Sequence, residues 1–463
     1  MSRKYLIRIT ELERLLSEQA EALRQKDQQL SLVEETEAFL RSALARAEEK
    51  IEEEERETEH LRAQIEKLRR MLFGTRSEKL RREVEQAEAL LNQRRQDSDR
   101  YSGWEDDPQV PRQLRQSRPI ERGIAGSGLL ARVLTGKYCE HLPLYRQSEI
   151  FARQGAELSR ALLSNWVDAC CQLMTPLNDA LYRYVMNTRK VHTDDIPVKV
   201  LAPGRKKAKT GRIWTYVRDD RNAGSSEPPA VWFAYSPDRQ GKHPVQHLRP
   251  FRGILQADAF SGYDRLFSAE REGGALTEVA CWAHARRKIH DVYISSKSTT
   301  AEEALKRISE LYAIEDEIRG LPESERLAAR QQRSKALLTS LHEWMVEKNG
   351  TLSKKSRLGE AFSYVLNQWD ALCYYSDDGL AEADNNTAER ALRAVCLGKK
   401  NYMFFGNDHG GERGALLCGL IGSCRLNGID PEAYLRHILS VLPEWPSNRV
   451  DELLPWNVVF TDK

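Results

Sequence analysis

The pattern of apolar and polar positions divides the chain into segments of different periodicity. Up to residue 72 and again over residues 129–173, apolar side chains recur every three or four positions, which predicts helices. From residue 190 the period becomes two, which predicts strands. Residues 295–378 are charged, lack strand alternation and predict further helices. The order indicates an α/β core preceded by helical segments and interrupted by an all-helical insertion.

A heptad register runs through residues 9–72, with apolar side chains at most a and d positions. This pattern predicts a coiled coil and therefore a homo-oligomer. The alternative is a long solvated helix that folds back on its own chain. The first domain is accordingly predicted over residues 1–97.

Residues 67–82 end this domain with a concentration of positive charge. The segment contains seven Lys and Arg residues and only one acidic residue, Glu78. Such a segment suits contacts with DNA phosphates, which position DNA without reading its sequence. The predicted contacts are Arg69, Arg70 and Arg76, and a solvated basic face is the equally consistent alternative.

A linker and a second helical domain follow. Residues 98–125 are polar and rich in Pro and Gly, which is typical of a linker. In the predicted domain of residues 126–188, helices at 144–153 and 159–170 flank a Gly-containing turn, as in a helix-turn-helix. Arg160 and Asn165 would face the DNA groove, unless the pair is an ordinary helical hairpin.

The predicted core spans residues 189–426, with the helical insertion at about 296–380 and a helical tail at 427–463. Its order is β-β-β-α-β followed by one more strand. The predicted strands cover residues 191–201, 213–218, 230–235, 253–263 and 277–282, and the helix covers residues 243–248.

Two acids fall within predicted strands. Asp258 lies in the apolar run GILQADAFSGY, where a carboxylate needs a cation or hydrogen bonds to offset its burial. In VHTDDIPVKVL the period of two puts Asp194 on the apolar face, whereas Asp195 shares its side with Lys199 and is predicted to be solvated. The third candidate, Glu389, flanks the apolar stripe of a helix that Asp384 is predicted to cap.

Two acids on strands and a third on a later helix form the usual ligand set for paired Mg2+ (or Mn2+) ions in phosphodiester chemistry. Two ions per active site are expected. Spacing alone leaves the assignment open, because 30% of the residues are charged and most acids are solvated or cap helices.

Several long motifs indicate which protein family the chain resembles. The stretches KLRRMLFGTRSEKL, YCEHLPLYRQSEIFARQGAELSRALLSNWV, HTDDIPVKVLAPG, TGRIWTYVRDD, GILQADAFSGYDRLF, CWAHARRK, DNNTAERALR and LNGIDPEAYLRHIL resemble the insertion-sequence-66 (IS66) family of bacterial DDE transposases. The resemblance implies an RNase H-like fold, with Asp194, Asp258 and Glu389 as catalytic, metal-binding acids. It also implies cleavage of insertion-sequence ends, strand transfer into target DNA and possible accessory transposition proteins.

The resemblance has one gap. Relatives usually carry a cysteine-rich zinc ribbon after the basic segment, but residues 98–125 contain no cysteine. The alternative is therefore a decayed copy, a non-catalytic DNA-binding protein dimerised by its coiled coil. A structural coiled-coil protein without a nucleic-acid role is a second rival.

Further DNA contacts are predicted around the acids. In CWAHARRK, His284 would orient DNA or a carboxylate while Arg286 and Arg287 contact phosphates, unless this is an ordinary helix start. Arg393 follows Glu389 by one helical turn. Residues 398–414 predict a glycine-rich DNA-binding loop with Lys399 and Lys400, or a solvated turn.

The composition limits how the protein could bind DNA and where in the cell it could act. The net charge is only +2, so DNA binding must come from local patches. The eight cysteines show no C-x-x-C spacing, which favours reduced core thiols. The segment MSRKYLIRIT is polar and the longest apolar stretch is far too short for a membrane span. A soluble bacterial cytoplasmic protein, nucleoid-associated when bound to DNA, is expected.

Overall fold

The computed structural model describes residues 119–120, 125–201 and 207–458. The predicted coiled coil, the basic segment with Arg69, Arg70 and Arg76, and most of the predicted linker lie outside the described residues. Residues 116–463 belong to one compact unit. In the described part of the chain, no helix is long and apolar enough to span a membrane.

In the described part of the chain, the sheet is preceded by helices α3 (Ser127–Tyr138), α4 (Leu144–Arg153), α5 (Arg160–Leu173) and α6 (Thr175–Met186). The predicted helix, turn and helix are present, with Gly155 in the left-handed region at φ +86° in the turn. The Ser159 hydroxyl caps α5 by accepting from the Leu162 N–H at 3.2 Å. Leu163 and Trp166 are buried, as their spacing predicts.

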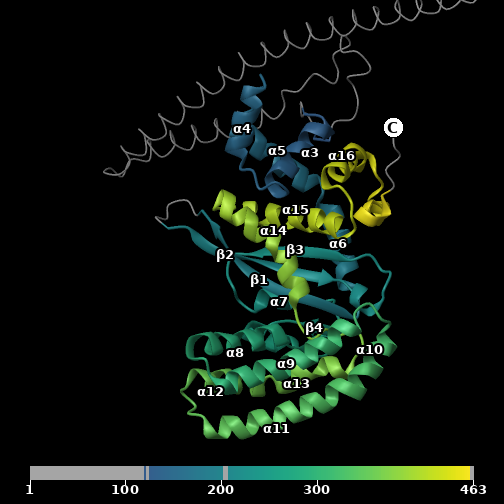
Figure 1. Ribbon diagram of the computed structural model, residues 1–463. Coiled ribbons are helices and arrows are strands. Elements are labelled where there is room, and N and C mark those ends of the chain that lie inside the picture. Colours follow the sequence, from purple (N-terminus) through teal and green to yellow (C-terminus); the bar gives the residue numbers. More distant parts are fainter. Residues whose placement is uncertain (1–118, 121–124, 202–206, 459–463) are drawn as a thin grey trace, which may run out of the picture. The chain divides into compact units, whose positions relative to one another are not determined.

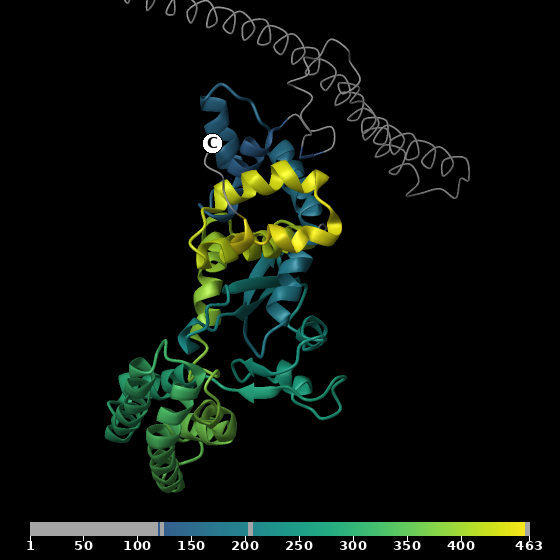
Figure 2. The same ribbon diagram turned by 90° about the vertical axis from the view of Figure 1, so that its right-hand side faces the viewer.

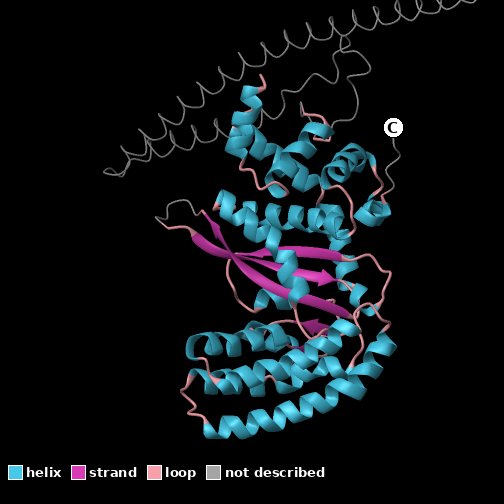
Figure 3. Ribbon diagram, viewed as in Figure 1, coloured by secondary structure: helices cyan, strands magenta, loops and turns pink. Residues whose placement is uncertain are grey.

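Five strands form one mixed sheet in the order β3-β2-β1-β4-β5 (Figure 3). The strands are β1 (Lys190–Val200), β2 (Lys209–Arg218), β3 (Ala230–Ser236), β4 (Ile254–Gln256) and β5 (Thr277–Val279). The first three are antiparallel to one another, whereas β4 runs parallel to both β1 and β5. Helix α7 (Lys242–His247) connects β3 to β4.

The predicted strand at residues 253–263 is wrong in its length. Pairing with β1 ends at Gln256, and the chain then turns into the 3-10 helix η3 (Ser261–Leu266). Tyr263 and Leu266 reach the core from η3. An apolar run therefore signals burial here without requiring a continuous strand, and Asp258 follows β4 instead of lying within it.

Between β5 and α14 (Asn386–Tyr402) the chain is helical, as its lack of strand alternation predicts, and the apolar core of these helices also includes Ile254 of β4 and Val279 of β5. The helices gather at one end of the compact unit in both views (Figures 1 and 2). They comprise α8 (Trp282–Ser296), α9 (Thr299–Glu317), α10 (Glu323–Ala329), the π-helical segment η4 (Arg330–Ser334), α11 (Lys335–Thr351), α12 (Arg357–Asn367), α13 (Trp369–Cys373) and the 3-10 helix η5 (Tyr374–Asp377).

Three helices complete the fold: α14 (Asn386–Tyr402), α15 (Asp408–Leu426) and α16 (Pro431–Val441). Short 3-10 helices η6 (Leu442–Glu444), η7 (Ser447–Leu453) and η8 (Pro455–Asn457) follow. Helix α14 packs against β1 and β2, and α15 packs against β3 (Figure 1). Asp430 caps α16 as its position predicts.

Two predictions for this region need correction. The N-cap of α14 is Asn385, because Asp384 instead accepts from the Asn386 N–H at 3.0 Å in a turn before the helix. The predicted loop at residues 398–414 is mostly helical, since α14 continues to Tyr402 and α15 begins at Asp408. Lys399 and Lys400 therefore lie in the last turn of α14.

Candidate active site

The parallel pairing of β1 with β4 brings two of the predicted acids side by side. His192 is the partner of Gln256, the last paired residue of β4. Asp194 and Asp258 each lie two residues further along, Asp194 within β1 and Asp258 just after the end of β4. The electrostatic interaction between the two carboxylates, which raises the pKa of Asp194, is consistent with this proximity.

The Asp194 side chain is partly buried, and no cation pairs with it among the described residues. Burial raises its pKa to about 7, and the negative charges of Asp258 and Glu389 contribute to the rise. The opposing influence is a hydrogen bond from the Asp195 backbone N–H to Oδ1 at 2.7 Å. The charged form of Asp194 is therefore compensated only in part, by this hydrogen bond.

Asp258 is in a similar environment. Burial raises its pKa, against the lowering electrostatic influence of the nearby His284 and Arg239 side chains. A hydrogen bond from the Phe260 backbone also lowers it. Together with Asp194, this carboxylate forms a concentration of negative charge at the end of β4.

The prediction that Asp195 is solvated is wrong. Its side chain is only 1% exposed and accepts from Arg212 Nη1 at 2.9 Å and from Arg239 Nε at 2.9 Å. Arg239 also stacks on the Phe260 ring, 3.9 Å from the centroid. The strand alternation could not identify these partners, because they come from β2 and from the segment after β3.

Glu389 lies in the first turn of α14, half-buried at 30% side-chain exposure. Its Oε1 is 3.6 Å from His284 Nε2 and 3.4 Å from Arg287 Nη2, both on α8. Within residues 125–201 and 207–458, no three His, Cys, Asp or Glu side chains are grouped closely enough to hold a metal ion. Glu389 is thus within electrostatic range of Asp194 but engaged by α8.

A basic cavity of about 540 Å³ lies beside Glu389. Arg286, Arg287 and His290 from α8 are its ionisable nitrogen-containing side chains, and no acid lines it. Its remaining lining residues are Ala283, Ser309, Tyr312 and Asn386. The cavity can accept a negatively charged group next to the acids.

The other predicted DNA contacts are dispersed. Arg160 and Asn165 are exposed on α5, which does not contribute to the acid cluster. Arg393 and Lys400 are exposed on α14, whereas Lys399 Nζ donates to the Pro197 carbonyl at 3.1 Å. Among the predicted DNA contacts that lie in the described residues, His284 and Arg287 are the ones that contact a predicted acid, Glu389.

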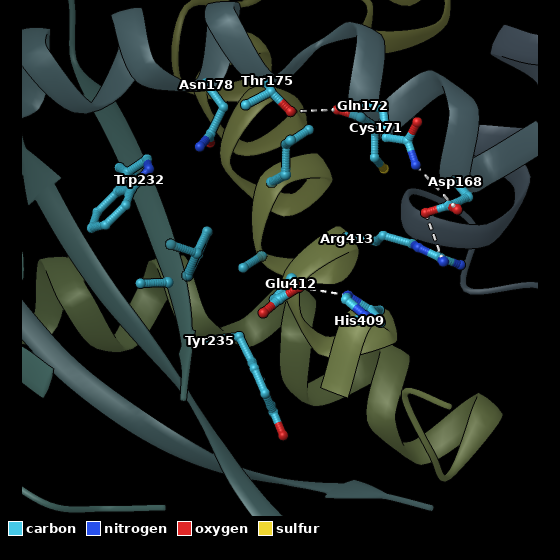
Figure 4. A pocket seen from close by; sticks show the side chains of 14 residues that line it. Asp168, Cys171, Gln172, Thr175, Asn178, Trp232, Tyr235, His409, Glu412 and Arg413 are labelled. Carbon is cyan, nitrogen blue, oxygen red and sulfur yellow. Dashed lines mark hydrogen bonds and ion pairs between the residues drawn. The ribbon is translucent and has the colours of Figure 1, made fainter. Parts of the chain in front are cut away.

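A separate cavity of about 330 Å³ lies between α5, α6, β3 and α15 (Figure 4). The Asp168–Arg413 ion pair at 2.6 Å and the contact between His409 and Glu412 at 3.0 Å belong to its wall. None of the three predicted acids lines it. This cavity is therefore not the acid site.

All eight cysteines lie in the described chain, and none forms a disulfide. Cys281 is 3% exposed, and burial raises its thiol pKa to about 12. Its Sγ accepts from the Asn385 N–H at 3.1 Å. Cys281 at the start of α8 thus contacts Asn385 at the start of α14, while His284 contacts Glu389.

The family models match nearly all of the described chain. The model described as Transposase IS66 family matches residues 122–413, and one described as IS66 C-terminal element matches residues 419–456. A third, Transposase C of IS166 homeodomain, matches residues 60–120. The chain belongs to the IS66 transposase family.

Two bacterial relatives of this IS66 member come from Sinorhizobium fredii (strain NBRC 101917 / NGR234). The uncharacterized protein y4hP is 40% identical over 347 residues, which cover 72% of this chain and 62% of that protein. The uncharacterized protein y4qI is 36% identical over 352 residues, which cover 75% and 65%. The IS66 chain therefore spans slightly less than two thirds of either relative.

The Asp194 environment predicts a pH-dependent cost in this IS66 protein when metal is withheld. The folded pKa of about 7 lies above the ordinary 3.8. The folded state therefore retains a proton that the unfolded chain has released, and the stability contributed by Asp194 falls as pH rises from about 4 to about 7. Above pH 7 the cost is on the order of 2 to 4 kcal/mol.

Asp194→Asn should therefore raise the melting temperature by several degrees at pH 8 in EDTA and have little effect at pH 4. Thermal melts of both proteins across this range test the prediction. Asp264→Asn, at an exposed position, is the matched control and should leave the profile unchanged. Identical profiles for the parent and Asp194→Asn would contradict the assigned environment.

Proposed function

We propose that this protein is a metal-dependent DNA transposase with an RNase H-like catalytic core. Asp194, Asp258 and Glu389 are its catalytic acids. The proximity of Asp194 on β1 to Asp258 after β4, with a raised pKa at both, carries the proposal. The antiparallel β1–β3 meander extended by two parallel strands supports the RNase H-like assignment.

The donor set fits Mg2+ or Mn2+. Both ions favour carboxylate oxygens, and two desolvated acids here have no protein cation to neutralise them fully. When bound, two divalent cations would activate the attacking oxygen and stabilise the leaving oxygen of a phosphodiester. Asp194 and Asp258 would supply the first ligands, and Glu389 would complete the set.

The basic side chains of α8 have two tasks in this proposal. Arg286 and Arg287 bind phosphates in the basic cavity, which holds the DNA strand against the acids. Because Arg287 also pairs with Glu389, a phosphate that engages Arg287 weakens this ion pair. The Glu389 carboxylate then becomes available to join Asp194 and Asp258.

The overall reaction is cleavage at the insertion-sequence ends followed by transfer of the freed 3′-hydroxyl into target DNA. The test is an in vitro strand-transfer assay on cognate DNA ends with Mg2+ or Mn2+ added or withheld. Metal-dependent joined products are expected. DNA binding without cleavage in either metal would overturn the proposal.

The proposal also includes a homo-oligomer and accessory transposition proteins. Measurements of molecular size in the presence of DNA test the homo-oligomer.

The engagement of Glu389 by His284 and Arg287 favours one alternative, a non-catalytic DNA-binding protein descended from a transposase. In that protein the α8–α14 contact would be permanent. It would bind DNA equally well with and without metal. The strand-transfer assay separates the two functions.

Arg286 offers a test of DNA binding that leaves the acids intact. Arg286→Ala should weaken binding about threefold to tenfold and reduce the dependence of log K on log salt by about one. Fluorescence anisotropy over a salt series measures both. Lys355→Ala, exposed in the turn before α12, is the control, and an equal loss in both variants would contradict a specific phosphate contact.

A further inference from the structure

Asn385 occupies an unusual position for a residue that begins a helix. It is fully buried at the N-cap of α14, yet its side chain makes no capping hydrogen bond to that helix. The side chain instead reaches β1. Capping is the common use of Asn at this position, so its diversion to another element requires a separate explanation.

The polar groups of Asn385 connect three elements. Its Nδ2 donates to the Thr193 carbonyl on β1 at 2.8 Å, and its Oδ1 lies 3.0 Å from His192 Nδ1. Its backbone N–H donates to Cys281 Sγ at the start of α8 at 3.1 Å. One buried residue therefore fixes the beginning of α14 against both β1 and α8.

The chemistry of the contacts determines the orientation of the amide. The Thr193 carbonyl can only accept, so the donor facing it must be Nδ2. Oδ1 consequently faces His192, whose Nδ1 must carry the proton that it donates. A side chain without both a donor and an acceptor would leave at least one of these buried groups unpaired, which is costly.

These contacts lie immediately beside the proposed catalytic acids. Thr193 precedes Asp194, and Asn385 precedes Glu389 by one helical turn, with the Glu389 N–H donating to the Asn385 carbonyl at 3.4 Å. Further along, Lys399 binds the Pro197 carbonyl. Helix α14 is thus attached to β1 on both sides of Glu389.

We propose that Asn385 is a positioning residue that fixes Glu389 relative to Asp194 and thereby sets the affinity of the site for divalent cations. The inference rests on the proposed function. Its physical basis is the short, rigid connection from the carbonyl before one acid to the helical turn that carries another. Asn385 itself contacts neither DNA nor metal in this role.

The test compares Asn385→Ala with Asn401→Ala in the full chain. Asn401 is an exposed residue on the same helix, and its Nδ2 donates only to the Leu397 carbonyl of α14. Asn385→Ala should lower kcat for DNA cleavage at least 100-fold and raise the half-saturating Mg2+ concentration at least fivefold. KM for DNA should change less than threefold, and Asn401→Ala should match the parent.

Hydrogen exchange provides a readout independent of cleavage. In Asn385→Ala the amides of residues 386–390 should exchange at least tenfold faster, while those of α16 remain protected. Mn2+ binding measured by electron paramagnetic resonance should weaken in parallel. If Asn385→Ala fails to fold, Asn385→Ser, which retains a small polar group, takes its place in all measurements.

The outcomes separate the two proposals. A folded Asn385 variant with parental kcat and Mg2+ dependence overturns the positioning role. Failure of the parent chain to cleave DNA overturns the proposed function, and the positioning role is then judged by exchange and Mn2+ affinity. Unchanged exchange at residues 386–390, or unchanged Mn2+ affinity, overturns it in that case as well.

Discussion

Asp258→Asn is expected to abolish metal-dependent DNA cleavage and strand transfer, with a loss of at least about a thousandfold. The change keeps the shape of the side chain but removes the negative charge that a divalent cation requires. Because Asp258 does not belong to the basic cavity, DNA affinity should remain within about threefold of the parent.

Cleavage of end-labelled DNA in Mg2+ and in Mn2+, together with anisotropy measurements of binding, tests this expectation. Asp264→Asn is the control, since Asp264 is exposed in η3 only six positions further along. Residual cleavage by Asp258→Asn close to the parental rate would exclude Asp258 from the reaction. A parallel loss of binding would indicate a structural effect instead.

Arg330→Met is expected to destabilise the helical insertion by about 3 to 5 kcal/mol. The guanidinium is fully buried and pairs with Glu315 through contacts at 2.9 and 2.5 Å. It also donates to the carbonyls of Tyr375, Asp378 and Ala381, at 3.0, 2.7 and 2.8 Å. Methionine fills the space but leaves a buried carboxylate and three carbonyls without this partner.

The matched control is Arg333→Met in the same π-helical segment. Arg333 pairs with Glu317 at the surface, where the side chains are 43% and 57% exposed, so little change in the free energy of unfolding is expected. Urea unfolding of both variants, with hydrogen exchange to locate the effect, measures the difference. Similar free energies of unfolding for the two variants would contradict the assigned importance of the Arg330 contacts.

The sequence predicts the elements whose signals are local. The period of two locates β1 and β3, and the helix-turn-helix spacing gives α4 its observed bounds. The absence of strand alternation between β5 and α14 indicates the helical insertion. These features depend on nearest neighbours along the chain, which a single sequence records directly.

The site is less predictable because its geometry depends on distant residues. The alternation of side chains along β1 could not predict that Asp195 forms ion pairs with Arg212 and Arg239, because these pairs depend on the positions of β2 and of the segment after β3. The apolar run around Asp258 did not reveal that β4 ends at Gln256. The contacts of Asn385 with β1 and α8 were also not predicted, although two consecutive asparagines at the start of a helix are a signal that could have indicated them.

The exposed turn between α11 and α12 offers a position at which the protein can be labelled. The turn at residues 352–356 joins α11 to α12, and Ser353, Lys354 and Lys355 are exposed there. Neither the acids nor the basic cavity draws a residue from this turn. It is therefore a suitable attachment point for a fluorophore or a small reporter domain, through which the proposed binding to DNA can be followed in real time.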